Sequence, residues 1–335
     1  MLHIPRWLPA SAAALVLAGP AAAAAPAGET IVSALAGPPK ASFLAKIRAG
    51  EMGGVILVGS WKPAEFAAVT KTLHATSCEI GRPLLILVDQ EGGFARRLTW
   101  AAPWRSAGEL GQLGVAETQR EAAAAAVALR NAGVDVDLAP VTDTLGRGGF
   151  LRGRSFGTDP SIVARLATTF IRALQAGRIA ATAKHFPGLG AARQNTDDRV
   201  VSVRTTRLGP FRSAIKAGTK LVMVSSAAYP KLDSAGTPAV FSHSIVTDLL
   251  RRSLGFRGVV VTDALDAPAA ARTPNAPVRA LAAGVDLLLY TSGSTAHYGY
   301  EEVAAAAQRS AATRAQLARA VAHIRALKRW LGRSC

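Results

Sequence analysis

Short apolar runs alternate with longer alanine-rich stretches along the chain, and this alternation predicts strands and helices. The short runs lack polar alternation, which is typical of strands buried on both faces of a parallel sheet. They cover residues 30–35, 54–58, 84–89, 134–139, 179–184, 220–225, 259–263 and 285–290. The longer stretches have helical spacing. They include residues 63–77, 116–132, 160–176, 242–254 and 313–330.

Strands that alternate with helices predict an α/β fold, and eight of them favour a single (β/α)8 barrel of the TIM type. A doubly wound open sheet is the competing fold. That fold usually carries a phosphate-binding glycine fingerprint after its first strand, and Gly53-Gly54 does not match one. No Pro/Gly/Ser-rich linker interrupts the chain after its first segment. We therefore expect one barrel domain over residues 26–335.

The first 25 residues have the plan of a secretory signal peptide. His3 and Arg6 precede an apolar run at residues 10–18, and a tract of alanines follows at 21–25. A membrane anchor is the alternative, but the run is shorter than the roughly 20 residues that a span needs. We expect cleavage near residues 23–25, no stable membrane span afterwards, and a secreted, periplasmic or cell-envelope location in a bacterium.

The chain is strongly basic, with a formal net charge of +17 and a pI near 10.9. Such a field attracts anionic polymers, and in an exported protein the cell envelope supplies them. A solvated arginine-rich surface without a specific partner is the alternative. Nucleic acid is not an expected partner, because no basic patch is interleaved with aromatic residues. Cys78 and Cys335 suit an exported protein, but the sequence leaves their pairing open.

Polar residues stand at or just after several predicted strand ends, where α/β barrels build their active sites. They are Asp89, Arg97, Arg154, Lys184, His185 and Asp263. An acid that ends an apolar run is costly to bury unless it is paired or functional. The histidines and cysteines show no metal-ligand spacing, so neither a metal nor an organic cofactor is expected. Carboxylates beside cations suit glycoside hydrolysis, in which one carboxylate attacks and another group donates a proton.

Five motifs in order resemble glycoside hydrolase family 3, and especially its single-domain bacterial β-N-acetylhexosaminidases. They are Gly-Val-Ile-Leu at 54–57, Asp-Gln-Glu-Gly-Gly at 89–93, Arg-Ser-Phe-Gly-Thr-Asp-Pro at 154–160, Lys-His-Phe-Pro-Gly at 184–188 and the run at 255–263 ending in Thr-Asp. The resemblance extends over roughly residues 30–331. It implies a retaining β-glycosidase that forms a covalent intermediate on Asp263, and the signal peptide adds that this enzyme is exported.

The same resemblance assigns sugar binding to Asp89, Arg97, Arg154, Lys184 and His185. We also expect neighbouring cations to hold the pKa of Asp263 low, so that this nucleophile stays ionised.

The acid/base loop departs from the family pattern. Hexosaminidases carry Asp-Ser-His after the Lys-His-Phe-Pro-Gly motif, and here the triplet is Asn195-Thr196-Asp197. Asp197, or its neighbour Asp198, is therefore the expected proton donor. Alternatively, the loop has lost its donor, and the protein is a catalytically impaired glycan-binding envelope protein. Phe94 and Ser225-Ser226 also differ from the family, which leaves open whether the sugar is a β-N-acetylglucosaminide of cell-wall material or a β-glucoside.

Overall fold

Eight parallel strands form the centre of the protein, which is described here over residues 26–335 by a computed structural model. The predicted signal peptide lies outside the described residues. The strands are β1 (Ile31–Leu35), β2 (Gly54–Leu57), β3 (Leu85–Val88), β6 (Val136–Asp137), β7 (Ala180–Phe186), β8 (Leu221–Val224), β9 (Val259–Thr262) and β10 (Leu288–Tyr290). Their order is β10-β1-β2-β3-β6-β7-β8-β9, and every pair is parallel.

The sheet closes on itself where β9 and β10, the two ends of this strand order, meet. The backbone N–H of Thr262 in β9 donates to the carbonyl of Leu287, 2.9 Å away, and Val261 bridges to Leu287 in parallel. Each strand lies where the hydrophobic pattern predicts one, although most are shorter than predicted. The expected (β/α)8 barrel is confirmed.

Successive strand residues face two different packing layers, as a pleated strand requires. In β3, Leu85 and Leu87 belong to the cluster inside the barrel, whereas Ile86 and Val88 pack with the outer layer that includes Phe66 of the surrounding helices. This arrangement explains the absence of polar alternation: both faces of each strand are buried.

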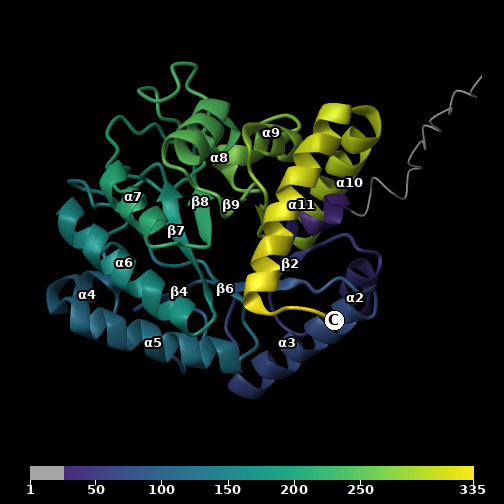
Figure 1. Ribbon diagram of the computed structural model, residues 1–335, viewed down its shortest axis with the longest axis horizontal. Helices are drawn as coiled ribbons and strands as arrows, with labels where there is room; N and C mark the ends of the chain where they lie inside the picture. The colour runs from purple at the N-terminus through teal and green to yellow at the C-terminus, as the bar shows by residue number, and fades with distance from the viewer. Residues whose placement is uncertain (1–25) are drawn as a thin grey trace, which may run out of the picture.

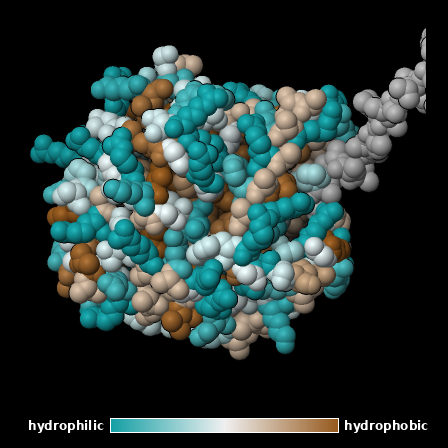
Figure 2. Space-filling model, viewed as in Figure 1, coloured by the Kyte–Doolittle hydropathy of each residue, from teal (hydrophilic) through white to brown (hydrophobic). Residues whose placement is uncertain are grey.

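Helices surround the barrel (Figure 1). They are α2 (Ala41–Arg48), α3 (Pro63–Cys78), α4 (Ala107–Leu113), α5 (Val115–Asn131), α6 (Pro160–Ala176), α7 (Leu208–Lys216), α8 (Pro268–Ala271), α9 (Ala276–Ala283), α10 (Gly293–Arg309) and α11 (Ala311–Leu331), with a 3-10 turn at Ala239–Phe241. The predicted helix at 242–254 is a π-helix over Ser244–Ser253. On the face shown in Figure 2, hydrophilic residues surround smaller hydrophobic patches. No helix within residues 26–335 is both long and apolar enough to cross a bilayer.

The last helix, α11, covers the N-terminal ends of the strands. Leu331 of α11 joins the buried cluster inside the barrel. Arg325 pairs with Glu29 just before β1, at 2.6 Å between Nη2 and Oε1, and Arg333 pairs with the buried Asp135 just before β6. The floor of the barrel is therefore closed by the C-terminal segment, and the opposite end is left for the site.

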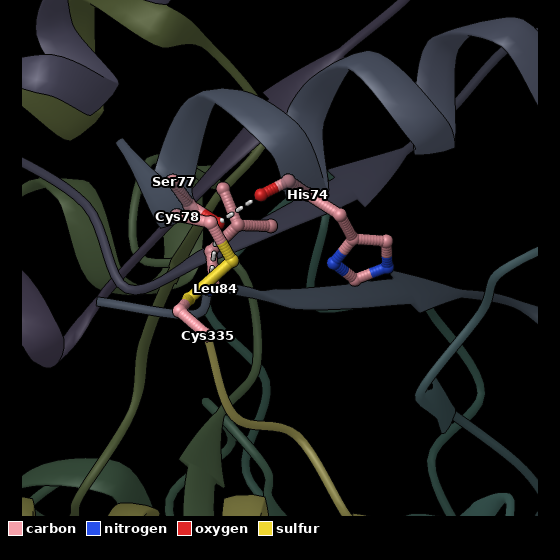
Figure 3. The surroundings of a disulfide bond; sticks show 5 residues. All are labelled: His74, Ser77, Cys78, Leu84 and Cys335. Carbon is pink, nitrogen blue, oxygen red and sulfur yellow. Dashed lines mark hydrogen bonds between the residues drawn. A yellow bond between two sulfur atoms is a disulfide. The ribbon is translucent and has the colours of Figure 1, made fainter. Parts of the chain in front are cut away.

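A disulfide bond joins Cys78, at the end of α3, to Cys335 (Figure 3). The two Cα atoms are 5.2 Å apart, although 257 residues separate them in sequence. The pairing that the sequence left open is thus present, and it ties the segment after α11 to the outer helix layer.

Candidate active site

A cavity of about 660 Å³ opens at the C-terminal ends of the strands. All seven residues predicted from the sequence line it, namely Asp89, Arg97, Arg154, Lys184, His185, Asp197 and Asp263. Asp198 is not among the lining residues, so of the two candidate proton donors only Asp197 faces the cavity. The strand-end argument thus gathers these groups in one place, while their individual roles remain proposals.

Two acids and two cations form a charged network on one side of the cavity. Lys184 Nζ lies 2.8 Å from Asp89 Oδ1 and 2.6 Å from Glu91 Oε1. Arg154 binds Glu91 with two parallel hydrogen bonds of 2.8 and 2.7 Å. Burial alone would raise the pKa of Glu91, but the charges of Lys184 and Arg154 outweigh burial and lower this pKa to about 2. Glu91 therefore stays ionised and holds both cations in position.

The sequence predicts that both acids of the Asp-Gln-Glu-Gly-Gly motif face a pocket, and Glu91 does line the cavity, but the sequence assigns it no role. Only the structure shows that it pairs with residues 63 and 93 positions away. We interpret Glu91 as a positioning residue, because its side chain is almost fully occupied by Lys184 and Arg154.

A short hairpin of β4 (Gln90–Gly92) and β5 (Ala95–Arg96) brings Arg97 to the cavity. The Gln90 side chain holds the hairpin in place, because its Oε1 accepts hydrogen bonds of 3.0 Å from the backbone of Arg97 and Leu98. Gly92 has φ +105°, and a Cβ there would collide with the carbonyl of Arg105. Arg97 Nη2 lies 4.0 Å from Asp89 Oδ2, at the outer limit of an ion pair.

His185 is fixed by the buried carboxylate of Asp143. One oxygen of Asp143 lies 2.8 Å from His185 Nδ1 and also accepts the His185 backbone N–H at 2.9 Å. The other oxygen accepts the backbone N–H of Leu189. With Nδ1 held in this way, Nε2 is the ring nitrogen left for a ligand. The sequence prediction missed Asp143, whose only signal was its place shortly after the run at 134–139.

Asp263 follows β9 (Val259–Thr262), lines the cavity and is half-buried. Its Oδ1 accepts a 2.9 Å hydrogen bond from the backbone N–H of Ala264. Burial raises the pKa of Asp263, the charge of His185 lowers it, and the charge of Asp197 raises it, with a net upward shift. The expectation of a low pKa is therefore wrong. Within residues 26–335, Lys184 forms its ion pairs with Asp89 and Glu91 and none with Asp263.

Asp197 lies on the exposed loop that follows β7, and its neighbour Asn195 orients it. Asn195 Nδ2 donates to Asp197 Oδ2 at 2.9 Å, while the backbone N–H of Asp197 donates to Asn195 Oδ1 at 3.2 Å. The charge of Asp197 acts on Asp263, which lines the same cavity. The site thus offers one sheltered carboxyl and one solvent-facing carboxyl around a space large enough for a sugar ring.

Comparisons with known proteins place the chain in a family. The model of the glycosyl hydrolase family 3 N terminal domain matches residues 31–327. An uncharacterized secreted glycosyl hydrolase of Arthroderma benhamiae is 36% identical over 274 residues, which cover 75% of this chain and 76% of the relative. A beta-hexosaminidase of Stenotrophomonas maltophilia is 36% identical over 240 residues, which cover 66% of this chain and 71% of the relative.

Solved structures agree. The chain superimposes on a beta-N-acetylhexosaminidase from Beutenbergia cavernae with a TM-score of 0.85 and 32% identity, covering 91% of this chain and 98% of that one. A family 3 beta-N-acetylglucosaminidase from a Paenibacillus species gives the same TM-score at 29% identity, with 92% of this chain and 62% of that chain covered. The protein spans slightly less than two thirds of that longer relative. The chain therefore belongs to glycoside hydrolase family 3 and is a glycosidase.

Proposed function

We propose that the protein is a retaining β-glycosidase with Asp263 as nucleophile and Asp197 as acid/base, and that it prefers β-N-acetylglucosaminides. The observation that carries this proposal is the placement of both carboxyls on one cavity, Asp263 at a strand end and Asp197 on a solvent-facing loop. The beta-hexosaminidase relatives support the choice of sugar.

In the first step, ionised Asp263 attacks the anomeric carbon, and the bond from that carbon to the leaving oxygen breaks. Asp197 gives its proton to that oxygen, which leaves as a hydroxyl group. In the second step, Asp197 takes a proton from water, and the water oxygen attacks the anomeric carbon. The bond to Asp263 then breaks, which releases the sugar with retained configuration and restores both carboxyls.

The charged network provides hydrogen-bond acceptors and donors for the sugar hydroxyls. Asp89 has one oxygen bound to Lys184 and the other 4.0 Å from Arg97, so its lone pairs are available to accept sugar hydroxyls. Lys184 and His185 Nε2 supply donors. Arg154 and Lys184 form their ion pairs with Glu91, while the charge of Lys184 also favours the ionised form of Asp263.

Export and a cell-wall substrate are part of the same proposal. The predicted signal peptide, the disulfide bond and a secreted fungal relative support export. The net charge of +17 supports binding to anionic envelope polymers near the substrate.

The test is hydrolysis of a panel of aryl β-glycosides, including the N-acetylglucosaminide and the glucoside. The variants are Asp197→Ala and, as matched control, Asp198→Ala, whose side chain does not line the cavity. We expect the first variant alone to lose activity with poor leaving groups and to regain it with azide. A folded wild-type protein that cleaves nothing but binds the sugars would instead establish the glycan-binding alternative.

A further inference from the structure

A second cavity of about 220 Å³ lies behind the loop that lines the active site, and we call it the outer cavity. Leu189 faces the main cavity, whereas its neighbours Gly188 and Gly190 line the outer cavity. The same short loop therefore separates the two spaces. Its remaining walls are Thr144, Leu145, Gly146, Arg147, Thr158, Ala191, Thr205 and Arg207.

The walls of the outer cavity offer cations and donors without matching acceptors. No aspartate or glutamate lines it. Neither Arg147 nor Arg207 forms an ion pair with any residue of the described chain. The side chains of Thr158 and Thr205, which line the outer cavity and are exposed, add hydroxyl donors to these two cations.

The outer cavity is built by tight backbone packing, so its walls do not need to rearrange. The N–H of Gly146 donates to the carbonyl of Gly190 at 2.7 Å, which joins the two loops. A Cβ at Gly190 would collide with the carbonyl of Thr144, and a Cβ at Gly146 would lie 2.8 Å from Ala191 Cα. Only glycine permits this approach, and a site that is already formed binds its ligand at a lower entropic cost.

We infer that the outer cavity binds an oxyanion, such as a phosphate, sulfate or carboxylate group. Two guanidinium groups and several hydroxyls suit a planar or tetrahedral anion, to which arginine donates in pairs. The anion is either a free inorganic ion or a charged group of a glycan bound on the outer side of this loop. Binding would also brace the loop that carries Asp197 seven positions after Gly190, although anion binding itself does not depend on the proposed hydrolysis.

The experiment measures sulfate binding by calorimetry at constant ionic strength, with chloride as the balancing ion. Sulfate is chosen because it does not take part in sugar transfer as an acceptor. The proteins are wild type, Arg147→Gln with Arg207→Gln, and a control with Arg309→Gln and Arg319→Gln. The control loses the same charge from exposed helix positions far along the chain. Thermal unfolding verifies that all three proteins are folded.

We expect one saturable site in wild type and in the control, with binding at least tenfold weaker in the Arg147 and Arg207 double variant. Equal binding by all three folded proteins, or no saturation, would mean an adventitious ion only and would overturn the inference. A parallel titration with a sulfated disaccharide distinguishes the sources. Tighter binding than sulfate, lost in the double variant, identifies a glycan group, and equal binding identifies the free ion.

Discussion

Lys184 Nζ lies 2.6 Å from Glu91 Oε1, and the two side chains are only 2% and 4% exposed. The contact holds a buried cation beside Asp89, to which Lys184 Nζ is also paired at 2.8 Å. A buried pair adds little net stability, since desolvation offsets the attraction. Removal of one partner is strongly destabilising, because it leaves the other charge buried and unpaired.

Glu91→Gln is expected to lower the free energy of unfolding by about 3–5 kcal/mol, the range for breaking a buried ion pair. Denaturant unfolding with a fluorescence readout measures it. The matched control is Asp137→Asn, which alters a carboxyl whose pKa burial raises well above its usual value. An amide at this position can still accept the hydrogen bond from the Gln90 backbone N–H, so the control should lose much less stability. Equal losses in both variants would contradict the ion-pair account.

The same pair predicts how stability depends on pH. The folded pKa of Glu91 is about 2, below its ordinary value of 4.5. A lowered pKa contributes stability above pH 4.5, and this contribution is lost as pH falls toward 2. One pKa unit corresponds to about 1.4 kcal/mol, so the contribution is roughly 3–4 kcal/mol. The difference in stability between wild type and Glu91→Gln should therefore shrink between pH 4.5 and 2. If the stability difference between the two proteins stayed constant over this pH range, the lowered pKa of Glu91 would not contribute to stability.

The raised pKa of Asp263 predicts the acid limb of the activity profile. The nucleophile must be ionised, so kcat/KM should decrease as the pH is lowered. The midpoint of this decrease should lie above the ordinary aspartate pKa of about 3.9. His185→Gln removes a charge that lowers this pKa, which should move the limb to higher pH. Asp263→Asn should reduce kcat roughly 10⁴-fold or more. The exposed Asp233→Asn serves as the control. A limb that stays in place in His185→Gln would contradict the assignment.

The disulfide bond predicts a loss of stability in Cys335→Ser. Cross-links over long loops stabilise by about 2–5 kcal/mol, mainly because they restrict the unfolded chain. We expect a lower Tm in Cys335→Ser, the same decrease in Cys78→Ser, and no further decrease in the double variant. Reducing agent should lower the Tm of wild type alone. Additive losses in the double variant would show that the cysteines act separately.

The sequence was sufficient for features that depend on neighbours along the chain. Asp89, Lys184 and Asp263 were found because each ends an apolar run, and all such ends meet at one edge of a barrel. The sequence was insufficient where distant residues decide the outcome. Asp143 holds His185 from 42 positions away, and the pKa of Asp263 is raised by its burial and by the charge of the distant Asp197. No local pattern encodes those choices.

The position of the disulfide also sets an order of events in the life of the molecule. Cys335 lies 257 residues after Cys78 in sequence, so the bond can form only after α11 has been synthesised. The presence of the disulfide therefore shows that the chain has been synthesised as far as Cys335. A molecule whose cysteines react with an alkylating reagent before reduction has not yet formed this bond, and counting such molecules would measure how many chains carry the completed cross-link.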